Sequence, residues 1–177
     1  MSEAALADLN LRVRRLEAER AIRELKARYL RACDLKDVEA VRDTLEPDAT
    51  IEFEGFPRFT DRGAFVAVYR ELGTAPGVFD IHHGANGVIE FVSENEATGR
   101  WSLLFHNINL AQRTLTQMGV EYEDRYVERD GRWRIAETHS RRTSFLAQAV
   151  SDDGVARVLA MGEAPDTPFA QPLTEPA

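Results

Sequence analysis

The sequence predicts an α+β domain whose helices come first and lie on one face of an antiparallel sheet. Apolar residues in the first third of the chain recur at helical spacing, whereas after residue 77 apolar and polar residues alternate. No regular alternation of strand and helix patterns joins the two regions, as a parallel sheet with helical crossovers would need. This order of elements favours helices packed against one side of an antiparallel sheet.

Three helices are expected from the spacing of apolar residues. The first covers residues 6–32, where apolar residues recur in steps of three and four and charged residues fill the other faces. A short helix over residues 37–45 is ended by Pro47, and a third covers residues 61–72 with Asp61 as its N-cap. The spacing within the first helix predicts one apolar stripe along its whole length.

The later part of the chain has the patterns of a sheet. Alternation predicts strands over residues 49–53, 79–91, 98–110, 118–126 and 133–142. Asp130 and Gly131 mark a hairpin turn before the last of them. From residue 146 onward the chain becomes rich in proline and acidic residues, and only residues 155–161 could form a packed element. We therefore expect a domain at residues 1–145 and a C-terminal extension at residues 146–177.

Length and charge exclude several classes of protein. The chain has 177 residues, of which 22 are basic and 30 acidic, and a formal net charge of −8. This length predicts one domain with its own core. The negative charge argues against a nucleic-acid partner or an anionic membrane surface, because both bind clustered Lys and Arg. No apolar run is long enough to span a membrane and no segment resembles a signal peptide, so we expect a cytoplasmic protein.

Sequence motifs give no support for a metal or a cofactor. The chain lacks the motifs of phosphate-binding loops, dinucleotide folds, zinc proteases and serine-hydrolase elbows. Its one cysteine, Cys33, excludes an internal disulfide and a cysteine-based zinc cluster, and fits a reducing compartment. His82 and His83 are neighbours on a predicted strand and point to opposite faces. We therefore expect no metal and no cofactor.

His82 lies on the predicted strand over residues 79–91. Alternation puts it on a mostly polar face with Asp80, Asn86 and Val88, while His83 lies on a mostly apolar face. On a curved sheet, the polar face could line a pocket closed by helices. From the residues alone, a structural or surface role stays open for both histidines.

Asp34 and Tyr29 lie near the end of the first predicted helix. Asp34 is either an N-cap for the next helix or a carboxylate that reaches a histidine inside the protein. Tyr29 lies on the apolar stripe, about 140° away from Asp34 on an ideal helix. The two residues share a pocket only if the helix ends or bends near Cys33.

Two further charged residues are candidates for a pocket. Asp124 is an acid on the otherwise apolar face of the strand over residues 118–126, so it is either structural or a pocket residue. Arg141 and Arg142 end the last predicted strand, and alternation sends only one of them inward. That arginine is either an ion-pair partner or an anchor for an anionic or carbonyl group of a ligand.

Six segments carry a recognisable pattern, and in order they are AIRELKARYLRACD (21–34), LEPDATIEF (45–53), IHHGANGVIEFVS (81–93), TGRW (98–101), YEDRYVERDGRWRIAET (122–138) and SRRTSF (140–145). Together they span roughly residues 21–145 and resemble the SnoaL-like branch of the nuclear transport factor 2-like superfamily. It implies a cone-shaped fold, in which a curved antiparallel sheet wraps around three helices and encloses a deep apolar pocket.

Within this superfamily, the chain looks similar to bile-acid 7α-dehydratase-like and scytalone dehydratase-like lyases, which are cofactor-free enzymes built on an Asp–His pair. The dehydratase pattern matches Tyr29, Asp34, His82 and Arg142. The match implies that His82 is a general base whose tautomer Asp34 fixes. It also implies that Tyr29 donates a hydrogen bond to a substrate oxygen and that Arg142 holds a carbonyl or carboxylate end. Phe105 stands where that pattern has an aspartate, which separates this chain from the dehydratase's own substrate.

The resemblance also implies a substrate class and an assembly. We expect a small hydrophobic, ring-containing substrate of steroid or polyketide type, contacted by Asp124, Phe105, Trp101 and Asn86. The expected activity is a dehydratase-type elimination that starts with proton abstraction. A non-catalytic small-molecule-binding protein and a ketosteroid isomerase-like enzyme with Asp124 as its base remain as alternatives. The lyases that this chain resembles assemble, so a homo-oligomer is expected, a trimer rather than a dimer.

Overall fold

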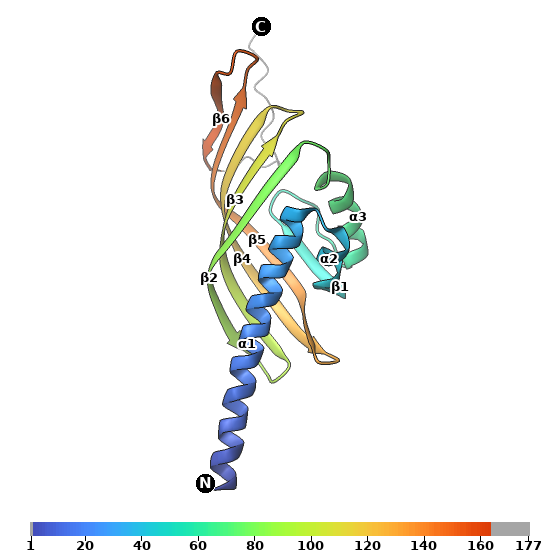
Figure 1. Cartoon of the computed structure of the whole chain (residues 1–177), viewed down its shortest axis with the longest axis vertical. Coiled ribbons are helices and arrows are strands. Elements are labelled where there is room, and N and C mark those ends of the chain that lie inside the picture. Colours follow the sequence, from blue (N-terminus) through green and yellow to red (C-terminus); the bar gives the residue numbers. More distant parts are fainter. Residues whose placement is uncertain (1, 164–177) are drawn as a thin grey trace.

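The computed structural model describes residues 2–163 and consists of helices packed on a six-stranded sheet (Figure 1). In chain order the elements are α1 (Glu3–Leu35), α2 (Val38–Asp43), β1 (Leu45–Phe53), α3 (Arg62–Leu72), β2 (Val78–Phe91), β3 (Glu96–Asn109), β4 (Thr114–Arg129), β5 (Arg132–Val150) and β6 (Ala156–Gly162). The predicted fold class, α+β with helices on one face of the sheet, is confirmed.

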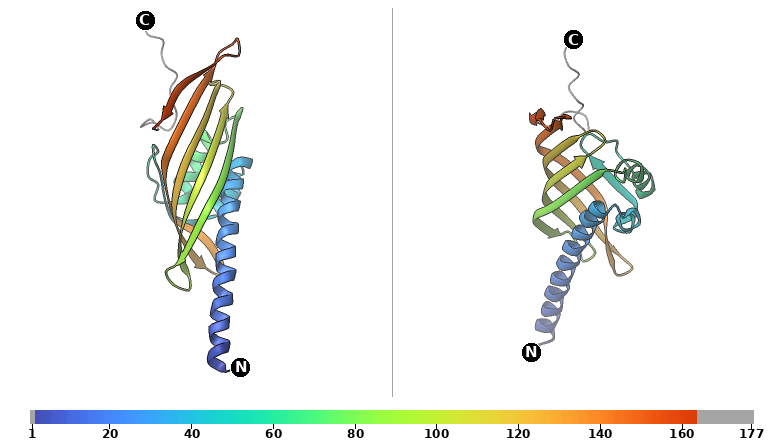
Figure 2. Two further views of the ribbon diagram at one scale, coloured as in Figure 1. Left: turned by 90° about the vertical axis from the view of Figure 1, so that its left-hand side faces the viewer. Right: turned by 45° about the horizontal axis from the view of Figure 1, so that its top comes forward.

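The sheet has the strand order β1-β5-β4-β3-β2, and β6 pairs with the far end of β5. All neighbours are antiparallel except β1 and β5, which run parallel. A fully antiparallel sheet was the expectation. The parallel pair is possible because α3 and three long strands separate β1 from β5, which provides the long connection that parallel strands need. The sheet curves without closing, and the helices lie on its concave side (Figures 1 and 2).

Helix α1 is packed along only part of its length. Its second half buries an apolar stripe that includes Ile22, Leu25 and Tyr29 against the sheet. The first half projects past the end of the sheet, so the same stripe is exposed between Leu6 and Leu16 (Figure 1). The apolar residues do form one stripe along α1, as predicted, but the sheet is too short to cover all of it.

Each of the two short helices, α2 and α3, begins at an aspartate that caps it. The carboxylate of Asp37 accepts a hydrogen bond from the backbone N–H of Ala40 and caps α2. Asp61 accepts in the same way from Ala64 at 2.8 Å and caps α3, as predicted. Since Asp37 caps α2, Asp34 is left for another role.

The last strands extend the sheet beyond its predicted limit. Strand β5 continues to Val150, so the domain boundary expected at residue 145 lies inside a strand. The element expected at residues 155–161 is confirmed as β6, which pairs with β5 from Phe145 to Val150. The rest of the predicted extension, residues 164–177, lies outside the described residues. None of the helices within residues 2–163 combines the length and apolar character needed to span a bilayer.

The cap of α3 offers a direct test of the fold, because α3 forms one wall of the cavity described below. Replacing Asp61 by Ala leaves the first N–H groups of α3 without an acceptor and is expected to lower the free energy of unfolding by about 1 kcal/mol. Asn caps helices as well as Asp, so Asp61→Asn is expected to keep the wild-type stability. Urea unfolding of the two variants measures the difference. Equal stability of the Ala and Asn variants would contradict the cap.

Candidate active site

An aspartate and a histidine meet where the last turn of α1 lies against β2. Asp34 Oδ1 accepts a hydrogen bond from the backbone N–H of His82 at 2.9 Å and lies 2.8 Å from His82 Nδ1. One carboxylate oxygen therefore fixes both the backbone and the ring of His82. With Asp34 ionised, the neutral ring carries its proton on Nδ1, which leaves the lone pair of Nε2 free for a proton. The predicted pair is present, and α1 ends at Leu35, one residue after Asp34.

The electrostatics of Asp34 favour its charged form. Partial burial works to raise the pKa of Asp34, but the hydrogen bonds and charge of His82, with a smaller contribution from Arg31, outweigh burial and hold that pKa below its usual value. Arg31 Nη1 lies 4.0 Å from Asp34 Oδ2 on the exposed side of α1. A carboxylate that stays ionised can stabilise a protonated imidazole beside it.

His82 opens into a cavity of about 400 Å³ between the concave face of the sheet and helices α1 and α3. Most of its lining is apolar, and much of it is aromatic. The aromatic side chains come from α1, β1, the loop after β1, α3, β3 and β4, and they are Tyr29, Phe53, Phe56, Phe59, Phe65, Tyr69, Phe105 and Tyr122. The ring of Phe105 lies 4.8 Å from that of His82, tilted by 57°. This size and lining suit a small ring-containing molecule.

The other predicted catalytic residues reach the same cavity. Tyr29 lines it from α1, and burial raises the pKa of Tyr29, so its hydroxyl stays protonated and can donate a hydrogen bond. The side chain of Arg142 lines it from β5 and is 6% exposed. Glu54 accepts a hydrogen bond from the backbone N–H of Arg142 at 2.6 Å and lies 3.7 Å from Arg142 Nη2. Glu54 therefore offsets part of the positive charge of Arg142.

One polar group of the cavity was not singled out from the sequence. Asp80 lies on the same face of β2 as His82, lines the cavity, and pairs with Lys36, the left-handed residue that ends α1. Asn107 on β3 donates a hydrogen bond to Asp80 at 2.6 Å. The sequence did contain a sign of this position, because alternation put Asp80 on the same face of the strand as His82. This bridge ties the end of α1 to the strands beside the Asp–His pair.

Three residues expected to contact substrate lie outside the lining of this cavity. Asp124 is fully buried in an ion pair with Lys26, with 2.7 Å between Asp124 Oδ2 and Lys26 Nζ. Its oxygen also accepts a hydrogen bond from the hydroxyl of Tyr126 at 2.6 Å, and that hydroxyl accepts one from Trp101 Nε1 at 2.9 Å. The structure thus corrects the expected role of Asp124 and Trp101 from substrate contact to a buried hydrogen-bonded network.

Asn86 is the third correction. It lies in a β-bulge between Ala85 and Val88, where the backbone of Asn86 is left-handed with φ of 52°. Its side chain is exposed and donates a hydrogen bond to Ser102 at 3.3 Å. Strict alternation placed Asn86 beside His82, but the extra residue of the bulge breaks that alternation. Asn86 therefore turns away from the cavity.

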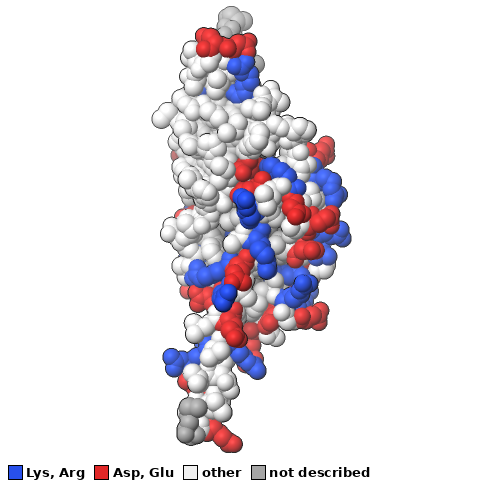
Figure 3. Space-filling model, in the orientation of Figure 1, with Lys and Arg blue, Asp and Glu red and all other residues white. Residues whose placement is uncertain are grey.

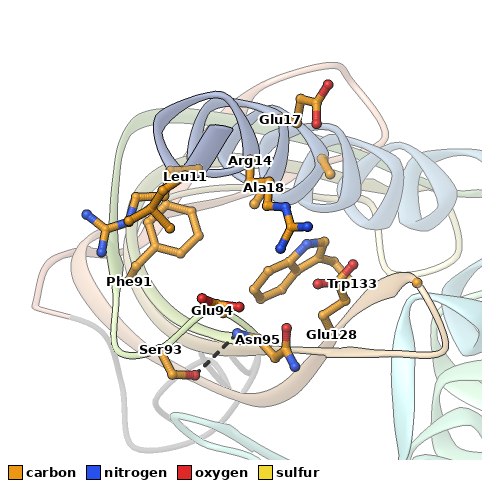
Figure 4. A pocket seen from close by; sticks show the side chains of 13 residues that line it. Leu11, Arg14, Glu17, Ala18, Phe91, Ser93, Glu94, Asn95, Glu128 and Trp133 are labelled. Carbon is orange, nitrogen blue, oxygen red and sulfur yellow. Dashed lines mark hydrogen bonds between the residues drawn. The ribbon is translucent and has the colours of Figure 1, made fainter. Parts of the chain in front are cut away.

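A second hollow of about 420 Å³ lies between the first half of α1 and the turns that follow β2 and β4 (Figure 4). Arg14 reaches over Trp133, and Glu94, Asn95 and Glu128 lie around the rim. It contains no histidine or cysteine. Within residues 2–163, no three His, Cys, Asp or Glu side chains are grouped so that they could hold a metal. The Asp34–His82 cavity is therefore the candidate active site.

Most of the chain matches a known protein family. Residues 14–139 match the model of the SnoaL-like domain. The chain belongs to the SnoaL-like domain family. The match covers the packed part of α1, strands β1 to β4 and β5 as far as His139, so it includes Tyr29, Asp34 and His82.

Solved structures share the fold of this SnoaL-like domain. A putative scytalone dehydratase from Novosphingobium aromaticivorans is 26% identical with a TM-score of 0.70, over 75% of this chain and 88% of that chain. A type 2 hexachlorocyclohexane dehydrochlorinase is 21% identical with a TM-score of 0.70, over 86% and 97%. An NTF2-like protein with a cystatin-like fold from N. aromaticivorans is 23% identical with a TM-score of 0.64, over 76% and 88%. The resemblance stated from the sequence is confirmed.

The low pKa of Asp34 predicts how the stability of the SnoaL-like domain depends on pH. A carboxylate whose pKa is depressed by folding contributes stability above its unfolded pKa and loses it as the pH falls through the folded value. The unfolded reference for Asp34 is 3.8. The stability advantage of the wild type over Asp34→Asn is therefore expected to be full above about pH 5 and to shrink below about pH 4. Urea unfolding at a series of pH values measures this, and a pH-independent difference would refute it.

Proposed function

We propose that this SnoaL-like protein is a cofactor-independent lyase in which His82 removes a proton from carbon. The Asp34–His82 hydrogen bond, which opens onto an apolar cavity, is the observation that carries the proposal. A dehydrochlorinase and a putative scytalone dehydratase share its fold, which supports lyase-type or isomerase-type activity. A dehydratase-type elimination of water is the specific reaction that we infer.

The reaction balances without a cofactor. Nε2 of His82 takes a proton from the carbon next to a substrate carbonyl, and the electrons of the C–H bond form an enolate. Asp34 stabilises the imidazolium that results. The enolate collapses to a C=C bond and expels hydroxide from the β carbon, and the imidazolium returns its proton to form water. The products are an unsaturated carbonyl compound, water and the starting form of His82.

The lining of the cavity favours an uncharged substrate with a carbonyl oxygen. Arg142 could hold a carbonyl or a carboxylate, but Glu54 already lies against it. A second carboxylate at this position would meet the charge of Glu54 as well as that of Arg142. The aromatic lining and the volume of about 400 Å³ suit one or two fused rings. We therefore infer a neutral, ring-containing β-hydroxy carbonyl compound.

Two alternatives can be compared with this proposal. An isomerase with a carboxylate base at Asp124 is disfavoured, because Asp124 is paired with Lys26 outside the cavity. A non-catalytic binding protein would need the cavity and Arg142 but not the Asp–His pair. The distance of 2.8 Å between Asp34 Oδ1 and His82 Nδ1, with His82 facing the cavity, favours catalysis.

Exchange of carbon-bound hydrogen tests the proposal before the natural substrate is known. We expect the protein to catalyse incorporation of deuterium from D₂O into a bicyclic ketone such as 2-tetralone, followed by mass spectrometry. His82→Ala is expected to slow exchange roughly hundredfold or more, and Asp34→Asn to slow it as well. His83→Ala is the matched control, since His83 is the exposed neighbour on the outer face of β2. Exchange that survives in His82→Ala would overturn the proposal.

We also propose that the protein assembles with copies of itself through the outer face of β2 and β3. This face is apolar and exposed around Phe79, Ile81 and Leu104, and Leu104 lies opposite His83 in the pairing of β2 with β3. Charged side chains gather along α1 and over the other helices, whereas the surface over the upper part of the sheet is nearly free of them (Figure 3). A face of this kind fits a neighbouring copy of the same chain.

Light scattering tests this assembly. The wild type is expected to have a mass above that of one chain, with three chains favoured over two. Leu104→Lys is expected to shift the mass towards one chain, because association would bury the new charge. Val92→Lys, at an exposed position beside the turn after β2, is expected to leave the mass unchanged. A single-chain mass for the wild type, or an unchanged assembly in Leu104→Lys, would contradict this interface.

A further inference from the structure

A buried ion pair lies beside the cavity and is not used by the Asp34–His82 pair. Lys26 and Asp124 are 1% and 0% exposed, with 2.7 Å between Lys26 Nζ and Asp124 Oδ2. Burial lowers the pKa of Lys26, while Asp124 raises it and compensates only in part. Burying two charges costs free energy, and an apolar pair of similar size is often as stable. Packing alone therefore does not explain this ion pair, and the groups that Lys26 contacts indicate its role.

The ammonium of Lys26 lies against two aromatic rings of the cavity. Nζ is 3.8 Å from the centre of the Tyr122 ring and 5.5 Å from that of the Tyr29 ring. A cation over the face of a tyrosine draws electron density from the ring. The hydroxyl of such a tyrosine becomes a stronger hydrogen-bond donor. Asp124 keeps the pair neutral overall, so no net charge is added beneath the cavity.

The hydroxyls of Tyr29 and Tyr122 are available to a ligand. Both residues line the cavity, and within residues 2–163 neither hydroxyl is paired with another protein group or sealed from the cavity. The other two tyrosines differ, because Tyr69 donates its hydroxyl hydrogen to the Cys33 carbonyl and Tyr126 donates to Asp124. The cavity thus presents two tyrosine hydroxyls whose hydrogen-bond donors are unused.

Both hydroxyls keep their protons. Burial raises the pKa of Tyr122, and Cys33 and Asp124 raise it further. Burial also raises the pKa of Tyr29, to which the neighbouring Cys33 and Tyr122 add. Both rings flank Lys26 Nζ, so the two tyrosines border the same part of the cavity. Two protonated hydroxyls in a site with little water are donors suited to an oxygen that gains negative charge.

We propose that Tyr29 and Tyr122 together form an oxyanion pocket that binds the substrate's carbonyl oxygen as it becomes an enolate, and that Lys26 and Asp124 are positioning residues for Tyr122. This rests on the proposed proton abstraction by His82 and assigns the substrate as a carbonyl compound that enolises. Each tyrosine donates a hydrogen bond and keeps its proton. The proton from carbon goes to His82, and the negative charge rests on the oxygen between the two hydroxyls.

Binding of 4-nitrophenol tests the pocket independently of catalysis, since its phenolate is a stable aromatic oxyanion with its own absorption band. We expect the wild type to bind the ionised form. Tyr122→Phe and Tyr29→Phe are each expected to weaken phenolate binding roughly tenfold or more, because a hydrogen bond to a charged oxygen is lost. Tyr69→Phe is the matched control, because its hydroxyl already binds Cys33, and it is expected to change affinity by less than about twofold.

The ionised fraction of the bound dye is a second measurement, which a purely structural role for Tyr122 would not change. At a fixed pH, this fraction is expected to fall in Tyr122→Phe and, to a smaller degree, in a Lys26→Met, Asp124→Asn double variant. If the double variant does not fold, as judged by circular dichroism, the comparison of Tyr122→Phe with Tyr69→Phe decides alone. No binding of the phenolate by the wild type, or equal binding by Tyr122→Phe, would overturn the oxyanion pocket.

The outcomes separate this inference from the proposed function. If phenolate binding depends on Tyr122 but no hydrogen exchange is seen, the oxyanion pocket stands and proton abstraction by His82 fails. If exchange depends on His82 while exchange and phenolate binding are both unchanged in Tyr122→Phe, the proposed function stands and the oxyanion pocket fails.

Discussion

The structure depends on one carboxylate oxygen that holds a helix end and a strand together. Asp34 Oδ1 accepts from both the backbone and the ring of His82, so the last turn of α1 is fixed to β2 at the residue that enters the cavity. Close approach is possible because residue 84 is a glycine, and a Cβ there would lie 2.6 Å from Leu30 Cδ1. The bridge between Lys36 and Asp80 fixes the same helix end a second time. The orientation of His82 therefore follows from the packing of α1 itself.

Four pairs of opposite charge lie around the cavity. In each pair, one residue lines the cavity or contacts a residue that lines it, and a residue of opposite charge lies beside it. The pairs are Asp34 with His82 when the ring is protonated, Arg142 with Glu54, Asp80 with Lys36, and Lys26 with Asp124. The rest of the lining is largely apolar and aromatic. A site of this kind binds neutral molecules and stabilises charge that arises during the reaction, because its dipoles are already fixed.

Residue spacing predicted much of the fold and part of the cavity lining, and the predictions that were wrong have definite physical causes. Alternation put His82 and Asp80 on one face, and that face does line the cavity. The apolar face with Phe79 and Ile81 lies outside, because the helices cover the polar face of the strand. The bulge after Ala85 reversed the expected direction of Asn86.

The roles of buried polar residues were the hardest to predict, since they depend on partners distant in the chain. Asp124 was singled out because it stands on an apolar face, but its partner Lys26 is on α1, and spacing within one strand cannot reveal that pair. Trp101 was expected at the substrate and instead donates to Tyr126 in the same network. Tyr122 was visible only as one member of an apolar face. Its position over Lys26 gives it a meaning that the sequence could not supply.

Proton abstraction by His82 depends on the tautomer of its ring, and nitrogen NMR of the protein labelled with ¹⁵N-histidine measures that tautomer. We predict that neutral His82 carries its proton on Nδ1, with Nε2 unprotonated and facing the cavity. Asp34→Asn identifies the signal, because its nitrogen shifts should be the ones that change. A neutral His82 protonated on Nε2, or one that exchanges freely between tautomers as in water, would contradict the proposed base.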